Sequence, residues 1–109
     1  MALDPNDLAA PILEAIEPVL SKYWGDVKEY AETEAQKMAT TLASITKLRR
    51  ADRINNQQAQ ALLEMQKHAM QAVLLAVEGI GLVAAQNAVN AGLAAVKDTV
   101  NRAMGFVLL

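Results

Sequence analysis

The sequence predicts an all-α protein of long amphipathic helices, arranged as a helical hairpin or an extended rod and associated with other chains. No segment shows the alternation of apolar and polar residues that marks a half-buried β-strand. All three prolines lie within the first 18 residues, so proline interrupts no helix beyond them. Apolar residues then recur at spacings near 3.6, as along one face of a helix. At this length we expect one helical assembly domain, residues 1–109.

The N-terminal segment, residues 1–25, is predicted to be short and kinked because it holds every proline. Asp7 is placed to cap a short helix that has Pro11 in its first turn. Pro18 either kinks that helix or begins the next one. Residues 26–54 then predict one amphipathic helix, whose apolar face is interrupted only by Glu34.

A polar stretch with the sequence RRADRINNQQAQ, residues 49–60, divides the helical region. Asn55 and Asn56 are the best candidates for a turn, because asparagine tolerates left-handed backbone angles. A turn here would give a hairpin whose amphipathic arms cover each other. Without a turn, residues 28–104 would form a rod about 115 Å long. The composition is compatible with both, and we favour the hairpin.

The next helix, expected over residues 57–104, is rich in small residues and apolar around most of its circumference. Residues 69–96 are 28 positions, of which 20 are apolar, nine of those alanine. Their polar residues follow one narrow stripe that includes Gln71, Gln86 and Asn90. A chain of this length has little else to cover so much apolar surface. We therefore expect it to pack against copies of itself, a partner subunit or lipid.

The presence of Gly79 and Gly81 in a predicted helix requires an explanation, because glycine destabilises a helix by about 1 kcal/mol relative to alanine. One reason is the close approach of another helix, since small residues continue at spacings of three and four. The residues assigned to this helix-packing and assembly surface are Gly79, Gly81, Ala85, Ala88 and Gly92. A plain kink at the glycines is the alternative.

The net charge of −2 hides an uneven distribution along the chain. Residues 1–34 carry eight acids and two bases, and residues 35–68 carry six bases and two acids. Such halves pair the arms of a hairpin or pair successive subunits, unless they are simply solvated. The basic cluster Lys47, Arg49, Arg50 and Arg53 has no interleaved aromatic residue, so we do not expect nucleic acid as a partner.

No catalytic site is predicted. The chain has no cysteine and one histidine, which leaves zinc sites and histidine-based dyads without ligands. No nucleophile, base and orienting group have spacings that argue for proximity, so we expect neither an enzyme, nor a cofactor, nor a small-molecule substrate. The lack of cysteine and of a signal-peptide pattern favours a cytoplasmic protein.

Two residues are candidates for a pH switch. Glu78 is the only acidic or basic residue, histidine apart, between Lys67 and Lys97, and a carboxylate in apolar surroundings is easier to protonate. His68 is the other candidate, because histidine changes charge near neutral pH. The alternatives are a wet helix edge for Glu78 and a solvated or core-edge position for His68.

A membrane-active oligomer is the second hypothesis, because about 20 apolar residues suffice to cross a bilayer. Glu78, Gln86, Asn87 and Asn90 interrupt the stretch too often for a single lipid-exposed span. The hypothesis therefore takes the form of an inserted oligomer with its polar stripe facing a lumen, such as a pore-like phage or secretion component.

Residues 70–109 contain three short segments of note, IGL at 80–82, QNAVNA at 86–91 and GFVLL at 105–109. Through these segments this part of the chain resembles the R-body (refractile body, or killing trait) subunit family. These segments are similar to that family's IG(L/M), NAV(N/S)A and terminal GVxLL-like elements. The sequence departs from the family at Gly92 and Leu93, where glutamines are usual, and residues 1–34 have no counterpart there.

The resemblance implies a small protein that polymerises with related subunits into a cytoplasmic ribbon, wound as a roll and extended by acidification so as to rupture membranes. The residues themselves predict less: a cysteine-free, all-α chain with excess apolar surface. Together they predict a structural, self-assembling helical subunit whose partners are copies of itself or a related subunit.

Overall fold

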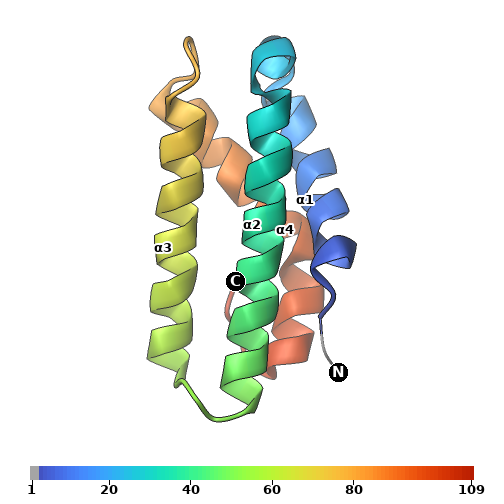
Figure 1. Ribbon diagram of the computed structural model, residues 1–109, viewed down its shortest axis with the longest axis vertical. Coiled ribbons are helices and arrows are strands. Elements are labelled where there is room, and N and C mark those ends of the chain that lie inside the picture. The colour runs from blue at the N-terminus through green and yellow to red at the C-terminus, as the bar shows by residue number, and fades with distance from the viewer. Residues whose placement is uncertain (1–2) are drawn as a thin grey trace.

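The computed structural model describes residues 3–109, which form a bundle of four α-helices (Figure 1). The helices are α1 (Pro5–Val19), α2 (Trp24–Arg50), α3 (Asn56–Leu75) and α4 (Leu82–Met104), with a 3₁₀ turn, η1 (Ser21–Tyr23), after the first. No strand occurs within residues 3–109, which confirms the all-α class. The bundle measures 42 × 22 × 18 Å, so the long rod considered for residues 28–104 is not formed.

Three of the helices pack around one another, and α3 lies at their side. α1 packs against α2 and α4, which also contact each other. α3 packs against α2 and α4 and lies away from α1, at the opposite edge of the bundle (Figure 1). The buried residues of α3 are Ala59, Leu63, Met70 and Leu74. Leu62 and Gln66 are partly buried as well, whereas Met65, His68 and Ala72 are exposed.

The N-terminal segment contains the 15-residue helix α1, whose apolar side belongs to the core. Asp4 caps α1 in place of Asp7, since its Oδ1 accepts a 2.9 Å hydrogen bond from the backbone N–H of Asn6. Pro5 takes the first helical position, where no intrahelical N–H is needed. The helix continues through Pro11 and Pro18, because burial of its apolar face offsets the missing backbone bonds. The buried residues of α1 are Leu8, Ile12 and Ile16.

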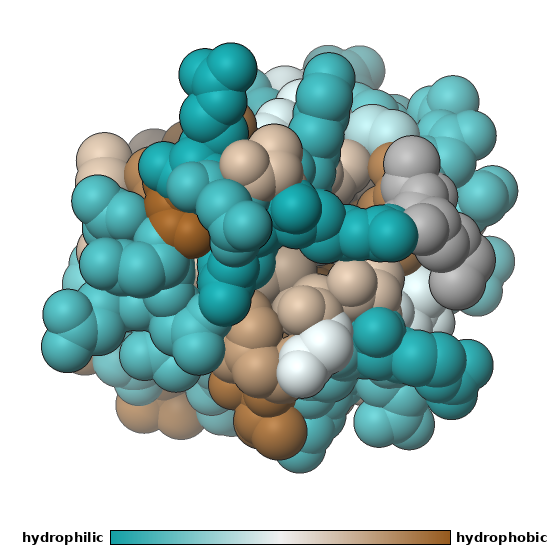
Figure 2. Space-filling model, turned by 90° about the horizontal axis from the view of Figure 1, so that it is seen from below, coloured by the Kyte–Doolittle hydropathy of each residue, from teal (hydrophilic) through white to brown (hydrophobic). Residues whose placement is uncertain are grey.

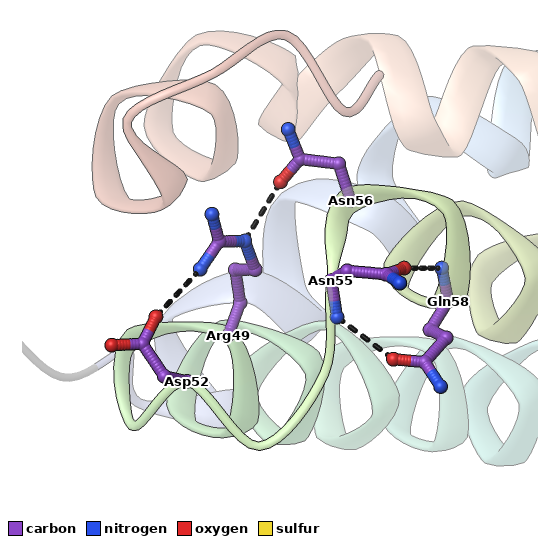
Figure 3. A network of polar contacts seen from close by, with 5 residues as sticks. All are labelled: Arg49, Asp52, Asn55, Asn56 and Gln58. Atoms are coloured by element: carbon purple, nitrogen blue, oxygen red, sulfur yellow. Dashed lines mark hydrogen bonds and ion pairs between the residues drawn. The ribbon is translucent and has the colours of Figure 1, made fainter.

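The chain reverses between α2 and α3, in the polar stretch that the sequence singles out. Asn55 caps α3 through a reciprocal pair of 2.8 Å hydrogen bonds with Gln58 (Figure 3). The left-handed residue is Asp52, with φ 56°, and not an asparagine as expected. Arg49 braces the loop, donating to Asn56 Oδ1 at 2.7 Å and to Asp52 Oδ1 at 3.1 Å. Capping therefore decides where α3 begins.

A second reversal divides the helix expected over residues 57–104 into α3 and α4. Gly79 has φ 93°, a left-handed backbone conformation that continues no helix. Gly81, in extended conformation, is the N-cap of α4. The ring of Tyr23 lies 3.2 Å from where a Gly79 Cβ would be, and Ile80 is buried. A continuous helix over residues 57–104 is therefore wrong. The alternative, a kink at the glycines, is closer to the observed break.

The small residues of α4 lie on its buried side and allow α1 to approach closely at Gly92. Ala85, Ala88 and Gly92 are buried. A Cβ at Gly92 would lie 3.0 Å from Ile12 Cγ2, so α1 approaches the backbone of α4 at this point. The close contact expected from the small-residue pattern is therefore present, but between two helices of the same chain.

The C-terminal segment folds back onto α4. Gly105, with φ 78°, ends the helix in the left-handed conformation that is common at helix C-termini. The side-chain oxygen of Asn101 accepts hydrogen bonds of 2.9 Å from the backbone N–H groups of Leu108 and Leu109. Leu108 is thereby held in the core.

Gly92→Leu is expected to lower the free energy of unfolding by about 1–3 kcal/mol, because the added side chain meets Ile12 and Ile16. Urea unfolding followed by circular dichroism measures the change. Gly25→Leu is the matched control, since no atom is found within 4 Å of the Cβ position of Gly25. An equal loss of stability in both variants would contradict the close packing of α1 on α4.

Candidate functional site

The outward side of α3 carries six exposed residues in one line, which we call the outer seam. Their spacings alternate between three and four, so they lie along one side of the helix. Met65 is 68% exposed and Leu75 is 39% exposed, both high for large apolar side chains. The seam consists of Gln58, Ala61, Met65, His68, Ala72 and Leu75. It is the longest regular line of exposed residues on α3 that holds neither an acidic residue nor a lysine or arginine.

A polar groove of about 380 Å³ lies beside the outer seam, between α3 and α4. Because the chain reverses at Gly79, the polar residues of α3 and the polar residues of α4 line the same groove. α3 contributes Glu64, Lys67, His68 and Gln71, and α4 contributes Gln86, Asn87, Val89 and Asn90. A smaller cavity of about 250 Å³, also between α3 and α4, is lined in part by Leu63, Leu93 and the C-terminal Leu108 and Leu109.

His68, the first pH candidate, is exposed and belongs to both the outer seam and the groove. The charged groups near it on α3 are Glu64 and Lys67, which form an ion pair of 3.4 Å. The α4 residues across the groove are uncharged. His68 is therefore solvated, which is the alternative to a pH switch that the sequence offers for this residue.

Glu78, the second pH candidate, lies in the loop between α3 and α4 and is exposed. The helix that would have surrounded it with apolar residues is broken at this point. The interpretation of Glu78 as a carboxylate in apolar surroundings is corrected, and the wet-edge interpretation describes its position.

The five residues assigned to helix packing separate into two groups. Ala85, Ala88 and Gly92 share the buried side of α4. Gly79 and Gly81 lie in the loop, and no atom is found within 4 Å of the Cβ position of Gly81. Their assignment to a helix contact is corrected: Gly79 serves the backbone turn, and Gly81 begins α4.

Among residues 3–109, Glu34 carries a buried carboxylate, and the sequence alone does not assign it to a site. Its side chain is 3% exposed and its Oε2 lies 3.2 Å from Nζ of Lys37, one turn along α2. Thr46, also buried on α2, satisfies its hydroxyl by donating to the carbonyl of Leu42 at 2.9 Å. The sequence does mark Glu34 as unusual, because it is the polar interruption of the apolar face of this helix.

The basic cluster lies at the end of the bundle where α2 meets α3. Figure 2 shows this end from below, with hydrophilic side chains around a paler hollow. Arg49 is committed to the loop contacts and lies 6.0 Å from the ring centre of Phe106. A groove of about 650 Å³ on this part of the molecule is lined by α2 residues that include Ala43 and Lys47, and by Leu3 and Pro5.

Ion pairs within residues 3–109 join side chains that are close in sequence. Lys37–Glu34, Arg49–Asp52 and Lys67–Glu64 each join residues three apart. They contribute little to holding the helices together. None of these contacts therefore makes the pairing of hairpin arms that the uneven charge distribution predicts.

Comparison with known proteins gives no relative: no family model matches the chain, and no curated protein or solved structure matches it. Within residues 3–109, no helix has the length and apolar character needed to span a bilayer. The same residues contain no group of three or more histidine, cysteine, aspartate or glutamate side chains placed to hold a metal ion.

Lys37→Met is expected to lower the free energy of unfolding by about 1–2 kcal/mol, because it leaves the buried Glu34 carboxylate without its ion-pair partner. The double variant Glu34→Leu/Lys37→Met is expected to recover that loss, since a buried apolar side chain needs no partner. Urea unfolding of the two single variants and the double variant measures the coupling. Additive effects of the two substitutions would contradict the ion pair.

Proposed function

We propose that the protein is a structural subunit that assembles with copies of itself through the outer seam of α3. The observation that carries the proposal is the exposure of Met65 and Leu75 on a helix side that also presents two alanines. Apolar residues exposed in one line favour association, because burying them removes apolar surface from water. Alanine at the same face lets a second helix approach closely.

The excess apolar surface expected from the sequence is smaller than the composition implies. α4 buries Ala85, Ala88 and Gly92 inside the bundle, where it contacts α1, α2 and α3. Large apolar side chains stay exposed on all four helices, and Met65 and Leu75 are those of α3. Leu82 and Val83, 51% and 69% exposed at the start of α4, add a second exposed apolar site next to the loop.

The resemblance to R-body subunits extends the proposal to a cytoplasmic ribbon, formed with copies or with a related subunit, that changes form with pH. Its three segments all belong to one structural unit here. Residues 80–82 begin α4, residues 86–91 lie within it, and residues 105–109 follow its glycine C-cap. His68 is exposed on α3, with Glu64 and Lys67 as its charged neighbours on that helix.

Sedimentation velocity and negative-stain electron microscopy at pH 7.5 and pH 5, without detergent, test this function. Filaments or ribbons whose form differs between the two pH values are the expected result. A monomer at both pH values and at high protein concentration would contradict self-assembly. Flotation of such a monomer with liposomes would favour the membrane-active alternative.

Ala72→Glu is expected to reduce assembly at least tenfold in apparent affinity, because it places a charge in the outer seam, between His68 and Leu75. Ala95→Glu is the matched control, since Ala95 is an exposed alanine on α4 outside the seam. Sedimentation of both variants over a concentration series gives the comparison. Equal assembly of the two variants would show that α3 is not the contact.

A further inference from the structure

We propose that the groove between the start of α1 and the last turns of α2 binds a single-chain amphiphile with an anionic head group, such as a medium-chain fatty acid. The groove shares no residue with the outer seam, so this inference goes beyond the proposed function and does not depend on it. It concerns the binding of the ligand alone.

The groove has the dimensions of a small-molecule site. Its volume is about 650 Å³, and ligand pockets commonly measure about 300–1,000 Å³. It is larger than either of the cavities between α3 and α4. One wall is a side of α2 that runs from Thr40 to Ala51, a length of about 16 Å. The groove is therefore long enough for one extended alkyl chain.

The walls of the groove are mainly apolar. Ala43 and Ala51 belong to the wall formed by α2, and Leu3 and Pro5 form the other wall at the start of α1. Thr46 also lines the groove, and its hydroxyl is already used, because it donates to a backbone carbonyl of α2. An alkyl chain bound between these walls would lose contact with water on both sides, which favours its binding.

The charged residues that line the groove are both cationic. They are Lys47 and Arg50, one turn apart on α2. Lys47 is exposed, and none of the ion pairs found within residues 3–109 includes it. The acidic residues at the start of α1, Asp4 and Asp7, do not line the groove, and Asp4 caps its own helix. Charge complementarity therefore selects an anionic head group over a cationic one.

The arrangement of the lining residues sets the orientation of the ligand. Lys47 and Arg50 lie toward the C-terminal end of the α2 wall, and Thr40 lies at its other end. The head group is placed against Nζ of Lys47, and the alkyl chain follows α2 over Ala43 toward Thr40. Affinity then depends on both parts of the ligand, the charge and the chain.

Isothermal titration calorimetry with laurate at pH 8, below its micelle concentration, tests the proposal on the full chain. Dodecyltrimethylammonium is the matched probe, because it has the same chain length and the opposite charge. One laurate per chain is the expected result, bound at least tenfold more tightly than the cationic amphiphile. Backbone amide chemical shifts locate the ligand, and the changes are expected to concentrate in residues 40–51.

Two variants test the two parts of the site. Lys47→Glu is expected to weaken laurate binding about fivefold or more, because it reverses the charge at the head group. Lys28→Glu is its control, an exposed lysine of α2 outside the groove. Ala43→Trp is expected to abolish binding by filling the space of the alkyl chain, and Ala95→Trp, at an exposed alanine of α4, controls for the added ring. Circular dichroism verifies that each variant is folded.

Equal affinity for the two amphiphiles, or equal weakening by Lys47→Glu and Lys28→Glu, would overturn the anionic head-group site. Shift changes centred on another helix, or no binding of laurate at all, would overturn the groove as its site. Binding to vesicles of an anionic phospholipid without binding of free laurate would replace the proposed ligand by a membrane surface. Assembly through the outer seam is measured separately by sedimentation, so its failure and the failure of this site are distinguishable.

Discussion

The left-handed backbone at Gly79 makes the rest of the bundle possible. It turns the most apolar part of the chain back on itself, so that α4 packs against α1, α2 and α3 and does not continue the direction of α3. Burial of Ile80 and the contact of Tyr23 with the loop hold this turn in place. Every buried small residue of α4 depends on that reversal, because a straight helix would carry it away from α1.

The helical content and the polar turn between α2 and α3 are readable from the sequence because they follow from local chemistry. Proline is confined to the N-terminal segment, apolar spacing is helical, and Asn55 is a good N-cap. The break at Gly79 is not readable in the same way. Glycine is compatible with a close contact, a kink or a turn, and only the partner helix decides among them.

The candidate site residues are likewise predictable from the sequence only in part. The small-residue pattern in Ala85, Ala88 and Gly92 predicts close packing correctly, but sequence spacing does not say whether the partner is another chain or α1 of the same chain. The outer seam was hidden for a related reason. Its alanines look like more of one long apolar helix until the structure separates the faces that α2 and α4 cover from the face that they leave open.

The contact of Gly92 with Ile12 and Ile16 also bears on the order in which the protein folds. It joins residues from opposite ends of the chain, whereas α2 with α3 and α3 with α4 are neighbours linked by short loops. Closing a long loop has a larger entropic cost than closing a short one, so the neighbouring helices are favoured to pair before α1 docks on α4. Docking of α1 is then the step that removes the alanine-rich side of α4 from solvent. A nascent chain would expose that side until the step is complete, and mutations at Gly92 would prolong the interval.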